Sequence, residues 1–237
     1  MPRPINLTSS MKRELYEEFQ KTLNDCILDE RVQFSKKITS ITDDDRKIHV
    51  IMSAKAYCKQ VMLVQSVSTE VAWHGIVTRN ENEFYIEDIL VHPQIVSGAK
   101  VDTDEALYGQ WMIDLYEKDP NAFLHLNLQA HSHVNMSPSP SRTDLSDQKQ
   151  RVIDLEENSF LVFMIVNKKG GMWISVYDKA NNTIYDAEDI EFDIDIDGTR
   201  ISDFIEESVS YLDSKLYVHR EDRYLLNQDR EYEYESW

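Results

Sequence analysis

"HSHVNMSPSPSRTD", residues 131–144, joins a predicted strand to a predicted helix and carries two histidines and an aspartate. Apolar and polar residues alternate over 122–133, as in a half-buried strand. One predicted face holds Leu124, Leu126, Leu128 and Ala130, and the other holds His125, Asn127, Gln129, His131 and His133. The helix is expected to begin near Ser141 or Thr143, which places Asp144 in its first turn.

This arrangement predicts a metal site. Residues i and i+2 of a strand point the same way, so the rings of His131 and His133 can approach one ion. A carboxylate at Asp144 is favoured by the helix dipole. Two imidazoles and one carboxylate leave a fourth tetrahedral position for water, as in catalytic rather than structural zinc sites. The alternative is a polar strand face lined by histidines, because His-x-His alone is a weak signal.

The residues around this segment resemble the JAMM metallopeptidases, also called the MPN or JAB family. His131, His133, ten intervening residues and Asp144 match the family signature, with Pro140 and Ser141 in register. The resemblance covers roughly residues 47–178. One departure is Val134, where many members have proline, and it affects the expected loop geometry rather than the ligands.

The resemblance implies a chemistry for the site. It implies Zn²⁺ as cofactor, held by His131, His133 and Asp144, and a general base for which Glu70 is the favoured candidate over Glu81, Glu83 and Glu87. Ser141 would donate a hydrogen bond to the oxyanion of the tetrahedral intermediate. Zinc makes water nucleophilic near neutral pH, and Glu70 would move the proton to the leaving amine. The implied reaction is amide hydrolysis without a covalent intermediate.

The resemblance also implies a protein or peptide substrate and leaves its identity open. Cleavage of isopeptide bonds or C-terminal tails of ubiquitin-like proteins is one expectation, and peptide processing in a bacterial or phage setting is another. Two alternatives stand beside the peptidase. One is a catalytically silent scaffold on the same fold, and the other is a metal-binding interaction module whose acidic end docks on a basic partner.

The order of predicted elements indicates an α/β (α+β) protein with a mixed β-sheet flanked by helices. The resemblance implies the JAMM or cytidine-deaminase-like version of that class. We expect an N-terminal helical segment at 1–46, the main domain at 47–198 and an acidic C-terminal extension at 199–237. Strands are predicted at 48–52, 71–78, 84–91, 122–133, 159–167, 172–178 and 183–196, and helices at 8–30, 53–68, 101–119, 143–158 and within 201–227.

Composition limits the possible partners. The formal net charge of −18 over 237 residues opposes binding to a nucleic-acid backbone. Residues 186–237 hold 17 acidic and 5 basic residues, a net charge of −12. No apolar run is long enough to span a membrane, no secretory signal is evident, and Cys26 and Cys58 are predicted to be unpaired thiols. We therefore expect a cytoplasmic protein, of which the sequence does not indicate the oligomeric state.

Overall fold

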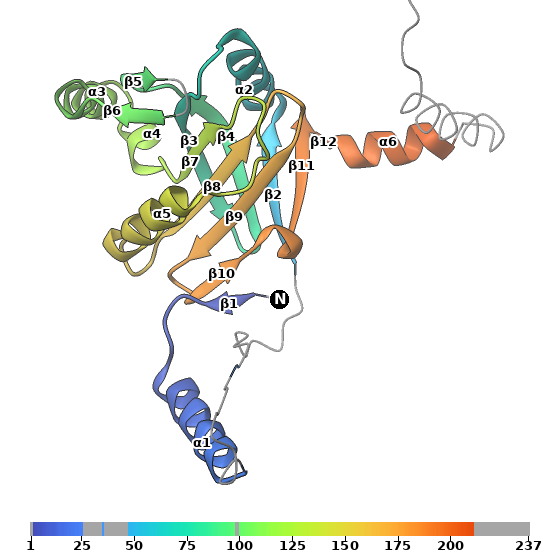
Figure 1. The fold of residues 1–237 in the computed structure, drawn as a ribbon. Coiled ribbons are helices and arrows are strands. Elements are labelled where there is room, and N and C mark those ends of the chain that lie inside the picture. The colour runs from blue at the N-terminus through green and yellow to red at the C-terminus, as the bar shows by residue number, and fades with distance from the viewer. Residues whose placement is uncertain (1, 26–34, 36–46, 98–99, 211–237) are drawn as a thin grey trace, which may run out of the picture.

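A computed structural model describes residues 2–25, 35, 47–97 and 100–210 as a mixed α/β protein with a curled sheet (Figure 1). The ten-stranded sheet has the order β1-β10-β9-β8-β7-β3-β4-β2-β11-β12, and β5 and β6 form a separate hairpin. The strands are β1 Arg3–Pro4, β2 Ile48–Ser53, β3 Ala72–Asn80, β4 Glu83–Leu90, β5 Gln94–Ser97, β6 Lys100–Thr103, β7 Leu128–Ser132, β8 Phe160–Val166, β9 Met172–Asp178, β10 Thr183–Tyr185, β11 Ile190–Ile196 and β12 Thr199–Arg200.

Helices lie on both faces of the sheet. The helical elements are α1 Ser9–Asp25, α2 Ala54–Ser66, α3 Glu105–Lys118, α4 Pro120–Leu124, α5 Arg142–Asp154, the short 3₁₀ turn η1 Ala187–Asp189 and α6 Ile201–Ser210. Helix α2 packs Ala56 and Val64 into the larger apolar cluster on one face. Helix α5 packs Val152 into a smaller cluster on the other face. In Figure 1, α1 and α6 extend away from the sheet at opposite ends.

Strand β8 shows why the sheet needs both layers. All seven of its residues are buried. Those with even numbers, such as Val162 and Met164, belong to the cluster that includes α2, whereas Leu161 and Phe163 pack against α5. Because successive strand residues point to opposite faces, a continuous apolar run is the pattern of a strand covered on both sides. The predicted buried strand at 159–167 is confirmed.

The predicted mixed sheet is also confirmed. Strands β2 and β4, β2 and β11, and β7 and β8 pair in parallel, and the other pairs are antiparallel. Strand β1 near the N-terminus pairs with β10, and β12 pairs with β11, so both flanking segments contribute short strands to the main sheet. No helix among the described residues has the length and apolarity that a membrane crossing requires.

The predicted strand at 122–133 is wrong in its first half. Residues 120–124 form α4, and the strand begins only at Leu128. Asp119 caps α4 by accepting a hydrogen bond from the backbone N–H of Ala122, at 2.9 Å, and Pro120 occupies the first turn, where proline is tolerated. Leu124, expected to face the core, is 68% exposed.

The predicted strand at 183–196 is divided. Its first part, β10, pairs with β9 near one edge of the sheet. Its second part, β11, pairs with β2 near the opposite edge. The turn η1 separates them. Three predictions lie outside the described residues: the end of the helix at 8–30, the thiol of Cys26, and residues 211–237 of the acidic extension. Cys58 is free and exposed.

Gly75 allows β3 to approach β7. A Cβ atom built there would lie 2.5 Å from Cδ2 and 2.8 Å from Cβ of the buried Leu128.

We therefore expect Gly75→Ala to lower the free energy of unfolding by about 1–3 kcal/mol through overpacking. Gly109, in the exposed part of α3, has nothing within 4 Å of such an atom. Gly109→Ala should instead raise stability by about 0.5–1 kcal/mol. Urea unfolding of both variants tests this contrast, and equal effects would contradict the close approach of β3 and β7.

Candidate metal centre

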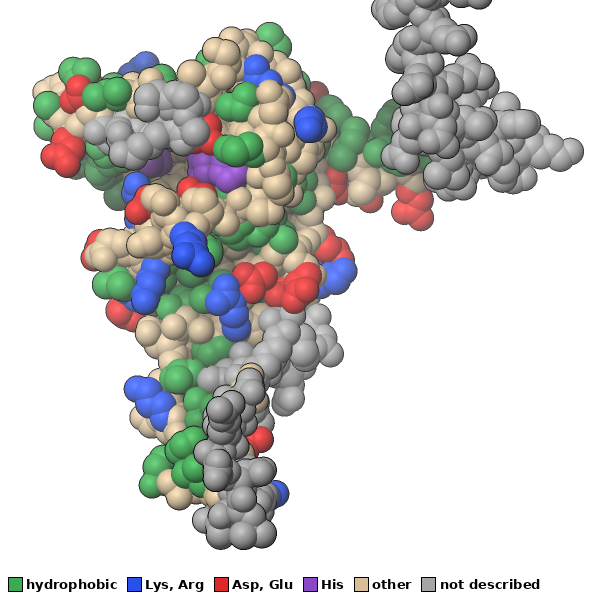
Figure 2. All heavy atoms as spheres, in the orientation of Figure 1, with side chains coloured by type: hydrophobic (Ala, Val, Ile, Leu, Met, Phe, Trp, Pro, Cys, Tyr) green, Lys and Arg blue, Asp and Glu red, His purple; other side chains and the backbone are tan. Residues whose placement is uncertain are grey.

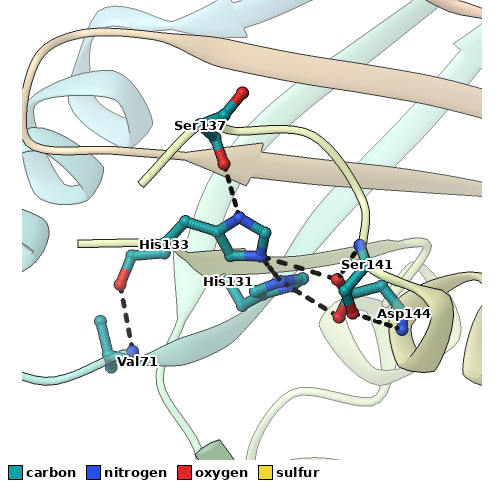
Figure 3. A network of polar contacts seen from close by, with 7 residues as sticks. Val71, His131, His133, Ser137, Ser141 and Asp144 are labelled. Atoms are coloured by element: carbon teal, nitrogen blue, oxygen red, sulfur yellow. Dashed lines mark hydrogen bonds and ion pairs between the residues drawn. The ribbon is translucent and has the colours of Figure 1, made fainter. Parts of the chain in front are cut away.

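His131, His133 and Asp144 meet where β7 ends and α5 begins (Figure 3). One potential ligand atom from each side chain lies within 4.8 Å of the other two. The Nε2 atoms of the two histidines are 3.0 Å apart. Asp144 places Oδ1 3.4 Å from Nε2 of His131 and Oδ2 3.6 Å from Nε2 of His133. These three side chains could hold a metal ion.

The register of the sheet brings the histidines to this point. His131 of β7 lies between Ala72 of antiparallel β3 and Ile165 of parallel β8. The backbone N–H of His133 donates to the carbonyl of Val166 at 2.9 Å, which extends the pairing beyond the last strand residue. His131 and His133 are therefore attached to two neighbouring strands rather than to a free loop.

The orientation of the His133 ring is set by a backbone carbonyl. Its Nδ1 lies 2.7 Å from the carbonyl oxygen of Ser137 (Figure 3). A carbonyl can only accept, so Nδ1 carries the proton, and neutral His133 has its lone pair on Nε2. Second partners of this kind commonly orient metal-binding histidines. Burial lowers the pKa of His131, although Asp144 raises it and His133 lowers it further, so His131 is neutral at neutral pH.

Asp144 is held by the start of α5. The backbone N–H of Ser141 donates to Oδ2 of Asp144 at 2.6 Å, and the N–H of Asp144 donates to Oγ of Ser141 at 3.2 Å. This is a capping box, in which Asp144 is the third residue of the helix. Burial raises the pKa of Asp144, but the hydrogen bonds with Ser141 and the two histidines outweigh it and lower the pKa. The carboxylate is thus ionised, and it turns Oδ1 toward His131 and Oδ2 toward His133.

Glu70 is buried next to this group. It is 8% exposed and directly precedes Val71, whose N–H donates to Oγ of Ser132 at 3.1 Å. The last paired residues here are Ala72 of β3 and His131 of β7, and the N–H of Ser132 donates to the carbonyl of Val71 at 2.9 Å, so Glu70 precedes β3 beside the end of β7. Burial raises the pKa of Glu70, with a lowering effect from His133 and a raising effect from Asp144. A carboxylate with a raised pKa beside a candidate metal site is suited to proton transfer.

The other three glutamates considered from the sequence lie elsewhere. Glu81 is in the turn between β3 and β4, and Glu87 is exposed on β4. Glu83 forms an ion pair with Arg200 at 2.8 Å. Glu70 is therefore the candidate that the fold brings to the two histidines.

A second pair of histidines was not expected from the sequence. His74 and His92, interpreted as polar or half-buried, are each only 7% exposed, and their ring centroids are 4.7 Å apart. Tyr108 of α3 places its hydroxyl 3.0 Å from Nε2 of His74, and Trp111 stacks on the same ring. This contact attaches α3 to the sheet. Figure 2 shows histidine side chains at the floor of a hollow between the α3 layer and α5.

Neither a family model nor a curated protein matches the sequence. Among solved structures, the chain is similar to the solution structure of protein DSY2949 from Desulfitobacterium hafniense. The sequence identity is 13% and the TM-score is 0.40, over 62% of this chain and 95% of that chain. A similarity this low carries no conclusion about fold or function.

The buried histidine pair predicts a pH dependence of stability. Burial, with the charge of Arg151, lowers the pKa of His92 to about 4, and burial, His92 and Arg151 lower that of His74 to about 3. Both histidines regain an ordinary pKa of about 6.5 when the chain unfolds. The unfolded chain then binds more protons below that pH, so stability is present above pH about 6.5 and decreases toward pH 4.

His74→Phe should reduce this decrease. Each histidine contributes at most about 1.4 kcal/mol per pH unit within its window. The variant should be less stable at neutral pH because it loses the contact with Tyr108, yet its stability should fall less steeply on acidification. Urea unfolding of both proteins in the presence of a chelator at several pH values measures both slopes. Parallel curves for wild type and His74→Phe would show that His74 is not held neutral.

Proposed function

We propose that this protein is a zinc-dependent peptidase of the JAMM type, which hydrolyses an amide or isopeptide bond in a protein or peptide. The observation that carries the proposal is the convergence of His131, His133 and Asp144 within 4.8 Å, with Glu70 buried beside them. Spacing in the sequence and proximity in the fold are separate observations, and both select these residues. The JAMM version of the mixed α/β fold, a cytoplasmic location and a substrate with a ubiquitin-like or other protein tail belong to the same proposal.

The donor set fits zinc. Bonds of about 2.0–2.1 Å to nitrogen and about 2.0–2.2 Å to oxygen at tetrahedral angles set ligand atoms roughly 3.3–3.5 Å apart. Here the two Nε2 atoms are 3.0 Å apart, and each faces a different oxygen of Asp144, at 3.4 Å for His131 and 3.6 Å for His133. Two imidazoles and one carboxylate also match the ligand types of catalytic zinc sites. Small movements of side chains would suffice to bring the donors to an ion.

The metal ligands, Glu70 and Ser141 would have different roles in the reaction. His131, His133 and Asp144 would hold a zinc ion, which as a Lewis acid would make water nucleophilic at neutral pH. The Glu70 carboxylate accepts a proton from the attacking water and later donates it to the nitrogen of the leaving amine. Ser141 uses an acceptor lone pair in the capping box, so its O–H remains free to donate to a developing oxyanion.

Two variants separate metal binding from turnover. Glu70→Gln should keep about one zinc per chain and lose about 10²-fold or more in turnover, because it removes proton transfer but no ligand. His131→Ala should lose the zinc itself. Glu87→Gln, which makes the same chemical change at an exposed position, serves as the control and should retain both properties.

The measurements are elemental analysis and cleavage of a panel of ubiquitin-like and short peptide fusions. Undiminished zinc in His131→Ala would contradict the assigned ligands. Cleavage by Glu70→Gln at the wild-type rate would show that Glu70 is the wrong base. Zinc binding by the wild type without cleavage of any fusion would favour the catalytically silent scaffold.

A further inference from the structure

The loop that orients His133 has its own support. Residues 134–140 form neither helix nor strand, yet the carbonyl of Ser137 within this loop accepts the Nδ1 proton of His133. Val134, at the start of the loop, has a φ of 44°, a conformation that is unfavourable for a β-branched residue. Proline, which many JAMM members carry at this position, cannot adopt that angle. The loop is therefore held in place by contacts from outside it.

Those contacts come from the turn between β8 and β9. The backbone N–H of Lys168 donates to the carbonyl of Val134 at 2.7 Å. The Nδ2 of Asn167 donates to the carbonyl of Met136 at 2.8 Å, one residue before Ser137. Gly171 lies close as well, because a Cβ atom there would be 3.1 Å from the Asn167 amide and 3.2 Å from Pro138. The turn and the loop thus pack so closely that an added carbon at Gly171 would require its neighbours to shift by a few tenths of an ångström.

The Asn167 amide is fixed in one orientation. Its Oδ1 accepts from the backbone N–H groups of Lys169, at 3.0 Å, and Gly171, at 2.8 Å, while Nδ2 points to Met136. A rotation that exchanged oxygen and nitrogen would set the NH₂ group against two backbone N–H donors and Oδ1 against the carbonyl of Met136. Asn167 is only 9% exposed, so water does not replace these partners without cost.

We propose that Asn167 is a positioning residue for the metal centre, which holds the Met136–Ser137 segment so that the Ser137 carbonyl keeps His133 in its metal-binding tautomer. This inference rests on the proposed metal site and adds a residue that contacts neither metal nor substrate. The proposal differs from a role of Asn167 that is confined to the turn. In that case its contacts with Lys169 and Gly171 would stabilise the turn, and loss of the contact with Met136 would leave His133 unaffected.

Asn167→Asp separates the two roles. Aspartate has the same shape and keeps an oxygen for the N–H groups of Lys169 and Gly171, but it lacks the donor to Met136. Asn182→Asp is the matched control. Asn182 also donates from Nδ2 to a carbonyl, that of Asn6 at 2.8 Å, and accepts from the N–H of Asn6, in a turn that belongs to the opposite end of the sheet. Both variants lose one such donor and gain one negative charge.

Two readouts test the proposal on the full-length chain. The first is zinc affinity by competition with a chelator, which we expect to weaken about tenfold or more in Asn167→Asp and to stay near wild type in Asn182→Asp. The second is the ¹⁵N spectrum of the His133 ring in zinc-free protein under alkaline conditions. Wild type and Asn182→Asp should show the Nδ1–H tautomer alone, and Asn167→Asp should show both tautomers.

Gly171→Ala provides a second route if Asn167→Asp does not fold. The added methyl presses on Asn167 and Pro138 but keeps every hydrogen-bonding group, so it should weaken zinc binding in the same direction. Unchanged affinity and an unchanged tautomer in the folded variants would overturn the proposal, as would an equal loss in Asn182→Asp. If wild type binds no zinc, the proposed function fails, and the tautomer comparison still decides the role of Asn167.

Discussion

The pairing of β7 with β3 on one side and with β8 on the other is the constraint on which the candidate site depends. It places His131 between Ala72 and Ile165 and brings Glu70 to the neighbourhood of His133. The close approach of β3 and β7 is possible because Gly75 has no side chain to collide with Leu128. Residues more than 60 positions apart in the chain therefore meet at the end of one strand.

Local hydrogen bonds then convert this meeting point into a set of oriented donors. The capping box at the start of α5 orients Asp144 and helps to lower its pKa. The Ser137 carbonyl orients the His133 ring through Nδ1. Groups fixed in this way lose little freedom on binding an ion, which is the general advantage of a preorganised site. Burial of Glu70 adds a carboxylate whose pKa is raised toward the range useful for proton transfer.

The sequence predicted the parts of the site that depend on local spacing. His-x-His on an alternating strand and an aspartate in a helix first turn are short-range patterns, and the structure brings those residues together. The continuous apolar run at 159–167 likewise predicted a strand, and the structure buries β8 on both faces. Helix α4 was missed because apolar alternation over 122–133 outweighed the capping signal of Asp119 and Pro120. Local capping decided the conformation there.

Other features could not be predicted because they depend on the tertiary structure. His74 and His92 have no regular spacing, and only the β3–β4 pairing and the position of α3 make them a buried aromatic group. Asn167 looks like an ordinary turn residue until the loop at 134–140 is placed beside it. Residues 183–196 are divided between opposite edges of the sheet because β10 pairs with β9 and β11 pairs with β2, which composition does not indicate.

The most direct measurement of the central claim is anomalous diffraction at the zinc edge from crystals of the full-length protein grown with zinc. We expect one strong peak within about 2.0–2.2 Å of Nε2 of His131, Nε2 of His133 and a carboxylate oxygen of Asp144. A peak at other residues, or no peak while these three side chains bond only to one another, would contradict it.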